Sequence, residues 1–278
     1  MGFAPVLEPE GDAAPVPRVK VLFPDVPSEA ITATVYREAG GRTSRVRGGI
    51  RTSAVGGFGL VDFEAPFQIT TAYYAVFYDG AGVELEVSDR AETRVDAVGT
   101  CVHQPLDPWR MVMGRILALA YTAESLSREF LGEVVRPQGR SVPVWIGSGR
   151  TGLTDVAFPF ATYTADEEQA MVRVFGEYED DQLPVVCIRS SHNLGIPPTF
   201  FGVVRKPVRK GWDQHVGGEV TLWDLTATEV APPAEALIVA RLTYGDLEAF
   251  YDSYTAFEGA YSRYLGAETD FALGDVVA

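Results

Sequence analysis

A glycine-rich segment carries the spacing that is most often associated with nucleotide chemistry. Gly147-Ser-Gly-Arg-Thr-Gly152 matches the dinucleotide-binding pattern Gly-x-Gly-x-x-Gly. That chemistry needs a strand before the glycines and a helix after them, because the helix N-terminus holds the pyrophosphate. The residues that follow, 153–159, are β-like and end in a proline that stops a helix. The segment therefore predicts a glycine-rich hairpin turn and no cofactor site.

Three histidines and two cysteines could supply metal ligands: Cys101, His103, Cys187, His192 and His215. Structural zinc sites place their ligands in close pairs such as Cys-x-x-Cys. No pair in this chain has the spacing of such a site, and both cysteines lie in apolar, strand-like runs. We expect two buried, reduced thiols, three histidines in loops or at strand ends, and no bound metal.

Two further polar clusters could suggest catalysis or calcium binding. Ser190-Ser191-His192 follows a predicted strand, but adjacent residues of an extended chain face opposite ways, and no Gly-x-Ser-x-Gly elbow is present. The acidic run at residues 177–181 lacks the alternating oxygen ligands of an EF-hand loop, and we interpret it as a solvated helix-to-strand connection. The sequence thus predicts no catalytic, cofactor-binding or metal-binding residue, and a protein that is not an enzyme.

The charge of the chain limits its partners. It has 278 residues and a formal net charge of −15. Binding to a polyanion needs a basic face, so we expect no nucleic-acid binding. The basic clusters at residues 42–51 and 205–210 are small, and each fits a solvated strand edge or a contact with an acidic neighbouring subunit. Neither a run of about 18 apolar residues nor a signal-peptide start is present, so we expect no membrane insertion and synthesis in a cytoplasm.

The elements that position these residues are mostly strands. Residues 1–18 contain several prolines and little periodicity, which indicates an extended arm that is loose or lies on a neighbour. Residues 19–98 consist of short strand-like runs separated by Gly-Gly and Asp-Gly turns, which is typical of a small antiparallel sandwich. Within them, residues 72–82 resemble the penultimate strand and hairpin of fibronectin type III modules. We therefore predict an immunoglobulin- or fibronectin-like β-sandwich here.

One helix is predicted within a second β region, residues 99–230. Thr164 and Glu167 have capping-box spacing, and the acidic residues 166–168 fall on the first turn, where the helix dipole favours negative charge. An apolar stripe then recurs at helical spacing, at Ala170, Met171, Val174, Phe175 and Tyr178. We expect a helix at about residues 165–177 whose stripe covers the second β domain.

The C-terminal region, residues 234–278, follows a Pro-Pro boundary and is the most patterned part of the sequence. Capping-box spacings at Thr243 and Thr255 fit one long helix or two short ones. Bulky side chains share one seam and must be buried against this chain's own β domain, another subunit or a ligand. The candidate subunit-interface residues are Tyr244, Leu247, Phe250, Tyr254, Phe257, Tyr261 and Tyr264.

Several segments between about residues 99 and 260 carry a likeness to a known family: Pro105-Leu-Asp-Pro108, Thr162-Tyr-Thr-Ala-Asp-Glu-Glu168, Leu183-Pro-Val-Val-Cys-Ile-Arg189, residues 200–212 leading into Glu219-Val-Thr-Leu-Trp-Asp-Leu225, and Leu242-Thr-Tyr-Gly-Asp-Leu247. In these segments and in the order of its parts, the chain resembles minor tail proteins, and among them distal tail proteins, of long-tailed bacteriophages that infect actinobacteria.

The resemblance implies a structural virion protein that is made in the host cytoplasm and joins the tail tube to the tail tip. Its implied partners are copies of itself in a ring, with sixfold symmetry expected and threefold symmetry as the alternative, and the tail-tube and tail-tip proteins. The predicted fold class is mainly β with a minor α component. It comprises a small N-terminal antiparallel β-sandwich, a tail-tube-like β-sandwich or barrel with one flanking helix, and a short helical C-terminal tail.

An alternative function is a carbohydrate-binding or adhesion module on a virion or cell surface. Such modules stack sugars on exposed aromatic rings, and four tryptophans are available for this purpose: Trp109, Trp145, Trp212 and Trp223. Exposure of several of these rings on one surface would favour this second function.

Overall fold

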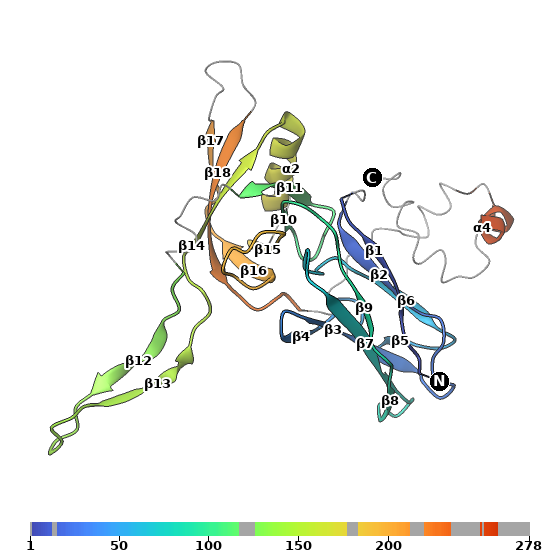
Figure 1. Cartoon of the computed structure of the whole chain (residues 1–278), viewed down its shortest axis with the longest axis horizontal. Coiled ribbons are helices and arrows are strands. Elements are labelled where there is room, and N and C mark those ends of the chain that lie inside the picture. The colour runs from blue at the N-terminus through green and yellow to red at the C-terminus, as the bar shows by residue number, and fades with distance from the viewer. Residues whose placement is uncertain are drawn as a thin grey trace. The chain divides into compact units, whose positions relative to one another are not determined.

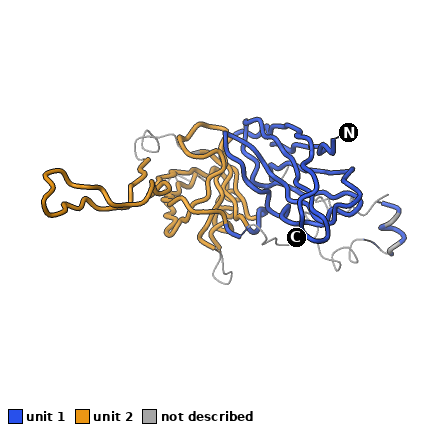
Figure 2. Tube along the Cα trace, turned by 90° about the horizontal axis from the view of Figure 1, so that it is seen from below, with its two compact units in different colours: residues 1–98, 106–109, 233–278 blue, residues 99–105, 110–232 orange. Residues whose placement is uncertain are grey.

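Strands dominate the protein. The computed structural model describes residues 2–12, 16–116, 126–176, 183–211, 220–234, 251 and 253–260. Of these residues, 48% lie in strands and 8% in helices, which confirms a mainly β fold with a minor α component. The chain divides into two compact units (Figure 2). Unit 1 comprises residues 1–98, 106–109 and 233–278, and unit 2 comprises residues 99–105 and 110–232.

Unit 1 is a sandwich of two antiparallel sheets (Figure 1). One sheet has the order β1-β2-β6, and the other has the order β4-β3-β7-β8, with β5 also paired to β3 and β9 to β7. The strands are β1 (Val6–Glu10), β2 (Arg18–Phe23), β3 (Thr32–Ala39), β4 (Arg42–Arg45), β5 (Thr52–Ser53), β6 (Phe58–Asp62), β7 (Thr71–Tyr78), β8 (Glu84–Val87) and β9 (Ala91–Thr93).

Aromatic side chains join the two sheets of unit 1. Phe23 on β2 stacks on Phe58 of β6, with ring centroids 4.8 Å apart, and meets Phe77 of β7 edge to face at 6.2 Å. On β7 the alternate residues Tyr73, Ala75 and Phe77 are fully buried, as a strand with one face on a core requires. This is the small antiparallel sandwich that the strand-and-turn pattern predicts.

The N-terminal arm is attached to unit 1. Val6–Glu10 forms β1, which pairs antiparallel with β2. The prediction of an arm that is loose or lies on a neighbour is therefore wrong for these residues. Pro9 lacks an N–H donor, but β1 is an edge strand, where a missing donor is tolerated. Asp12 extends the attachment, because its carboxylate accepts a hydrogen bond from the backbone N–H of Val98 at 2.9 Å.

Unit 2 is built on a closed, six-stranded antiparallel barrel with the order β14-β11-β10-β15-β16-β18. The pairing of β14 with β18 closes it, and β17 pairs with the other end of β18. The strands are β10 (Thr100–His103), β11 (Met111–Ile116), β14 (Val156–Thr162), β15 (Val185–Ser190), β16 (Thr199–Val204), β17 (Val208–Gly211) and β18 (Thr221–Glu229).

One helix, α2 (Ala165–Phe175), follows β14 and packs on β11 and β14. Its N-cap is the predicted one: Thr164 Oγ1 accepts a hydrogen bond from Glu167 N at 3.2 Å, and Glu167 Oε2 accepts one from Tyr163 N at 2.6 Å. Met171 and Val174 are fully buried and join the barrel core. The predicted helix and stripe are confirmed, except at Tyr178, which lies outside the described residues.

Polar side chains fix both ends of α2. At the C-terminal end, buried Gln104 donates hydrogen bonds to the carbonyls of Val174, at 2.6 Å, and Leu183, at 3.1 Å, which satisfies a helix-end acceptor. At the N-terminal end, the Glu168 carboxylate accepts a hydrogen bond from Thr221 Oγ1 at 2.8 Å and forms an ion pair with Arg209. The helix is therefore held to β17, β18 and the end of β10.

The remaining described elements are a hairpin and a short helix. The hairpin consists of β12 (Phe130–Val135) and β13 (Val144–Arg150), and the helix is α4 (Tyr254–Ala260). Neither described helix has the length and apolarity that crossing a membrane would require.

Replacing Met171 by alanine should test whether the stripe of α2 is part of the barrel core. We expect a loss of about 2–5 kcal/mol in the free energy of unfolding, as for other buried truncations to alanine. Arg173→Ala is the matched control, because its side chain is exposed on the same helix, and should change stability by no more than about 0.5 kcal/mol. Urea unfolding measures both. Equal small losses would mean that the stripe is not buried.

Candidate assembly surface

The hairpin of β12 and β13 is a two-stranded sheet that pairs with no other described strand. It extends away from the barrel strands of unit 2 (Figure 1). A type II turn at residues 137–140 joins its strands: Arg140 N donates to Pro137 O at 3.2 Å, and the third turn position is Gly139, with a φ of 85° that favours glycine. Residues 147–150 of the glycine-rich segment lie within β13, so the predicted hairpin turn at residues 147–152 is wrong.

The glycines of the hairpin make room for a tryptophan. Gly132 and Gly147 lie opposite each other across the two strands. A Cβ added to Gly132 would lie 2.5 Å from Trp145 Cζ2, and one added to Gly147 would lie 2.9 Å from Trp145 Nε1. The indole ring therefore covers the backbone that two residues without side chains leave open. From the sequence, a cofactor site or a turn was considered for the glycines at residues 147–152. In the structure, Gly147 instead makes room for the indole of Trp145.

The base of the hairpin is fixed to the barrel. Leu153, which follows β13, is buried in the barrel core, and Leu126, which precedes β12, packs against that core. Glu229, the last residue of β18, accepts a hydrogen bond from Leu153 N through its carboxylate at 2.8 Å and donates its own N–H to Leu153 O at 2.7 Å. The hairpin is thus anchored at one end and exposed along the rest of its length.

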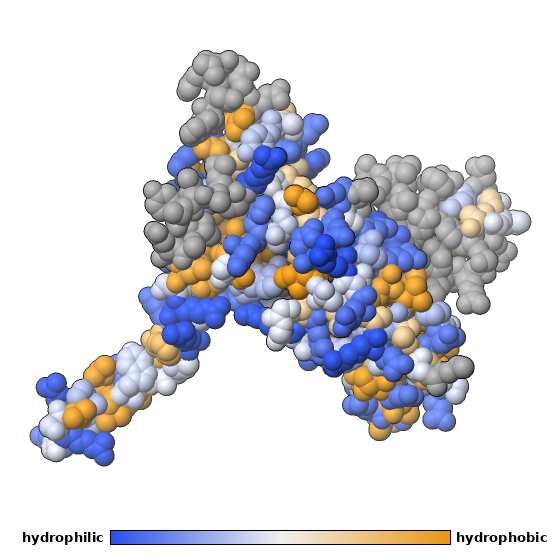
Figure 3. Space-filling model, viewed as in Figure 1, coloured by the Kyte–Doolittle hydropathy of each residue, from blue (hydrophilic) through white to orange (hydrophobic). Residues whose placement is uncertain are grey.

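Apolar side chains lie on both faces of the hairpin, and orange patches mark those on the face that Figure 3 shows. Val134 and Trp145 lie opposite each other on one face, whereas Ile146 lies opposite Glu133 and so shares the other face with Leu131. Six large apolar side chains are between 49% and 72% exposed: Phe130, Leu131, Val134, Val142, Trp145 and Ile146. This surface was missed from the sequence, because the apolar run at residues 130–135 has the same pattern whether or not a neighbour covers it.

Residues 126–152, which include the hairpin, also differ in charge from the rest of the chain. Four arginines and two glutamates give them a net charge of +2, within a protein of net charge −15. One arginine, Arg150, lies over the ring of Phe130, with its guanidinium carbon 4.9 Å from the ring centroid. The segment would therefore be attracted to an acidic surface.

The predicted interface in the C-terminal tail falls mostly outside the described residues. Tyr244, Leu247, Phe250, Tyr261 and Tyr264 lie there. Tyr254 begins α4, and Phe257 is buried, with its ring edge to face on that of Tyr251 at a centroid distance of 5.6 Å. These residues remain a predicted interface.

The histidines and cysteines occupy strand ends and the core of unit 2. Cys101 and Cys187 are buried free thiols, as predicted, and burial raises the pKa of Cys101 despite the nearby Arg189. His103 ends β10 opposite Cys187, and His192 lies in the loop after β15, while His215 lies outside the described residues. In the described part of the chain, no three His, Cys, Asp or Glu side chains gather as metal ligands would.

The serines of Ser190-Ser191-His192 join two strands. Ser190 Oγ lies 2.8 Å from Thr100 Oγ1, and Ser191 Oγ accepts a hydrogen bond from Gly99 N at 3.0 Å and donates one to Gly99 O at 3.3 Å. His192 N donates to Ser190 Oγ at 3.1 Å. These hydroxyls thus hold the ends of β10 and β15 together, while the acidic run at residues 177–181 lies outside the described residues.

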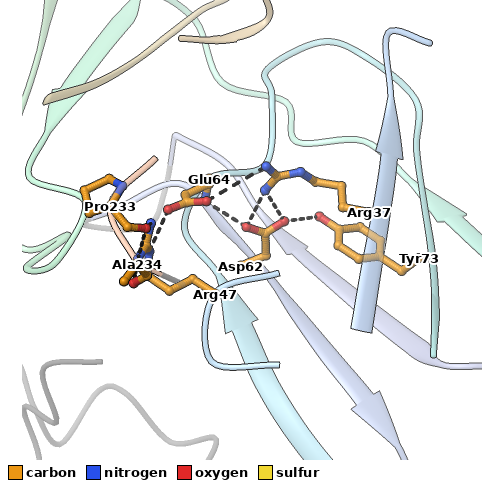
Figure 4. Close-up of polar contacts among 7 residues, drawn as sticks. All are labelled: Arg37, Arg47, Asp62, Glu64, Tyr73, Pro233 and Ala234. Atoms are coloured by element: carbon orange, nitrogen blue, oxygen red, sulfur yellow. Dashed lines mark hydrogen bonds and ion pairs between the residues drawn. The ribbon is translucent and has the colours of Figure 1, made fainter. Parts of the chain in front are cut away.

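A group of buried charges lies in unit 1 and centres on Asp62 (Figure 4). Arg37 Nη1 donates to both carboxylate oxygens of Asp62 at 2.7 Å, and the Tyr73 hydroxyl donates to Oδ2 at 2.8 Å. Burial alone would lower the pKa of Arg37, but the charge of Asp62 above all raises it. Asp62 is 1% exposed and these donors satisfy its carboxylate, so we interpret it as a structural residue whose charge depends on its partners.

Glu64 connects this group to the start of the C-terminal region. Its carboxylate accepts a hydrogen bond from Arg47 Nε at 2.8 Å and lies 4.0 Å from Arg37 Nη2. Arg47 also donates to the carbonyls of Pro233, at 3.3 Å, and Ala234, at 2.9 Å. Burial raises the pKa of Glu64, although Arg37 and Arg47 oppose the shift. Arg47 thus fixes the chain to unit 1 where the C-terminal region begins.

Comparison of the chain with protein-family models, with curated proteins and with solved structures gives no match.

Removing the arginine partner of Asp62 should destabilise unit 1 strongly. We expect Arg37→Met to cost about 3–5 kcal/mol in the free energy of unfolding, because a buried carboxylate loses its counter-charge. Adding Asp62→Asn should recover part of that loss, since the amide removes the unpaired charge and still accepts from Tyr73. Guanidinium unfolding of both variants measures the difference. A double variant less stable than Arg37→Met would contradict this account of the pair.

Glu64 should make stability depend on pH in a defined direction. Because its pKa is raised in the folded chain, its contribution to stability is present at acidic pH and is lost as pH rises through the folded pKa. Glu64→Gln removes this titration. The free energy of unfolding of the wild type relative to Glu64→Gln should therefore increase as pH is lowered from neutral toward mildly acidic values. The opposite trend in urea unfolding would mean that the two arginines outweigh burial.

Proposed function

We propose that this chain is a structural component of a bacteriophage tail: a minor, distal tail protein that forms a ring with copies of itself and joins the tail tube to the tail tip. The observation that carries the proposal is the hairpin of β12 and β13, which is apolar on both faces and pairs with no other described strand. Large exposed apolar surfaces on a folded protein mark sites of interaction.

The energetics of the hairpin favour burial in an assembly. A two-stranded hairpin in water is marginally stable on its own. Covering its six exposed apolar side chains would contribute on the order of 5–10 kcal/mol before ordering costs. A contact of that strength suits a ring, in which the same contact is repeated around the symmetry axis.

The two apolar faces also limit the geometry of binding. A hairpin with one apolar face needs only one covering surface, but this one exposes apolar side chains on both. A hairpin inserted between two surfaces buries both of its faces. An assembly of repeated subunits provides two such surfaces, one on each neighbouring copy. The positive charge of residues 126–152 matches the acidic character of the chain as a whole, so further copies are suitable neighbours.

The fold supports the proposal at a coarser level. A β-barrel flanked by one helix is what the resemblance to tail proteins implies, and unit 2 has such a barrel with α2 packed on it. Fold alone does not imply function. The resemblance therefore adds the tail as the place of assembly, and the hairpin supplies the physical reason for assembly.

The carbohydrate-binding alternative has less support among the tryptophans. Trp223 is buried and donates a hydrogen bond to Thr162 Oγ1 at 3.2 Å, and Trp109 is half-buried beside Phe63. Trp212 lies outside the described residues. Trp145 is exposed, but its ring covers the glycine pair of the hairpin. No second exposed tryptophan lies beside it in the described residues of the hairpin.

Charged substitutions on the hairpin should test the proposal. We expect the wild type to form rings by electron microscopy and a large species by light scattering after gel filtration. Val134→Glu with Ile146→Glu, one on each face, should give a monomer with an unchanged melting temperature. The matched control is Gln138→Glu with Ser141→Glu, which adds the same charge at the hairpin tip and should still assemble.

Three outcomes would contradict the proposal. The wild type could remain monomeric at every concentration, the two double variants could assemble equally well, or the monomer could bind a glycan array through Trp145. The number of subunits in the rings, expected to be six, would be counted from averaged images.

A further inference from the structure

Two edge strands of one sheet in unit 1 carry opposite charges. β4 and β8 end the order β4-β3-β7-β8 on opposite sides. The side chains of Arg42 and Arg45 on β4 are exposed, as are those of Glu84 and Glu86 on β8. One edge of the sheet is therefore basic and the opposite edge is acidic.

The acidic edge also exposes apolar side chains. Val83, Leu85 and Val87 are 59%, 37% and 46% exposed. An edge strand presents N–H and C=O groups that can pair with another chain, and natural sheets usually protect such edges. A strand that adds to β8 would cover these apolar side chains and pair with the side of β8 that no described strand occupies.

The direction of the strands allows the sheet to continue from one copy to the next. Each neighbouring pair in the order β4-β3-β7-β8 is antiparallel, so β4 and β8 run in opposite directions. When a second copy is placed beside β8 in the same orientation as the first, its β4 lies next to β8 and runs antiparallel to it. β4 and β8 also match in length, since each has four residues.

Charge disfavours the pairing of like edges. Two β8 strands paired antiparallel about Leu85 would place Glu84 of each copy opposite Glu86 of the other, and like charges directly opposite each other are destabilising. Two β4 strands would bring arginines together in the same way. The edge that complements β8 is therefore β4 of another copy.

We propose that β8 of one copy binds β4 of the next, so that the sheets of unit 1 join head to tail. One antiparallel register places Arg45 opposite Glu84, and Thr43 opposite Glu86. Such a contact is heterologous and closes into a ring when the rotation between copies allows it. The proposal rests on the self-assembly proposed above but uses a surface other than the hairpin.

A bulge keeps this contact short. The register between β7 and β8 shifts at Phe77 and Tyr78, which leaves Leu85 as the extra residue on β8. A four-residue pairing with a bulge is weak by itself. The β4–β8 contact would therefore set the direction of assembly, and it would add its strength to that of the hairpin contact.

Charge reversal should test the contact. Glu84→Arg with Glu86→Arg, or Arg42→Glu with Arg45→Glu, should each lower the association constant about tenfold or more. Combining all four changes should restore association. As a matched control, Glu84→Arg and Glu86→Arg are combined with Arg205→Glu and Lys206→Glu, exposed residues of unit 2. This control has the same net charge as the fourfold variant and should not restore association.

Cysteine cross-linking gives an independent measurement. A Glu84→Cys chain mixed with an Arg45→Cys chain should form a disulfide between copies, because opposite residues of paired strands lie close enough for one. The native Cys101 and Cys187 are buried and should not react. Melting temperatures identify any variant that fails to fold.

The outcomes separate this proposal from the proposed function. Assembly that depends on the hairpin but ignores the charge reversals and gives no mixed disulfide would overturn the β4–β8 contact alone. A wild type that never self-associates would overturn the proposed function as well. Recovery in the fourfold variant, without recovery in its control, supports the contact.

Discussion

The pairing of β14 with β18 is the constraint on which unit 2 depends. It runs from Val156 opposite Ala227 to Thr162 opposite Thr221, and it converts an open sheet into a closed barrel. The hairpin precedes β14 in the chain and α2 follows it, so β14 positions both of them. β18 holds them as well, through Glu229 at the hairpin base and Thr221 at the start of α2. Helix α2 and the hairpin are therefore both attached to this one pair of strands.

Closure also determines where surfaces for assembly remain. A closed barrel has no open strand edges. Among the described strands, open edges remain in the hairpin, in β17, and in the sheets of unit 1, whose longer sheet ends in β4 and β8. The hairpin and β8 each expose several large apolar side chains, whereas β1 exposes one, Val6, and β17 carries Arg209 and Lys210 in ion pairs. The hairpin and β8 are the two proposed contacts between copies.

Charge is distributed differently inside and outside unit 1. Inside, Arg37 binds Asp62, and Arg47 binds Glu64 and holds the chain at Pro233. Such buried pairs cost desolvation and are worth keeping only when every partner is present. Outside, the charges on β4 and β8 are exposed, so they cost little desolvation. The basic cluster at residues 42–51 therefore contains both partly buried and exposed charges. Arg47 binds Glu64 within unit 1, and Arg42 and Arg45 lie on the edge strand β4.

The sequence by itself determined the local elements. Alternation and turn residues predicted most strands, and the Thr164 cap with its apolar stripe predicted α2, because these signals act over a few residues. Tertiary structure decided what depends on distant pairing: that residues 6–10 join β2, that β14 closes on β18, and that Gly132 and Gly147 make room for Trp145. It also decided that the apolar strands at residues 130–135 and 144–150 are exposed. An apolar strand has the same sequence pattern whether a neighbour covers it or not, and only the paired structure shows that no described strand of this chain does so.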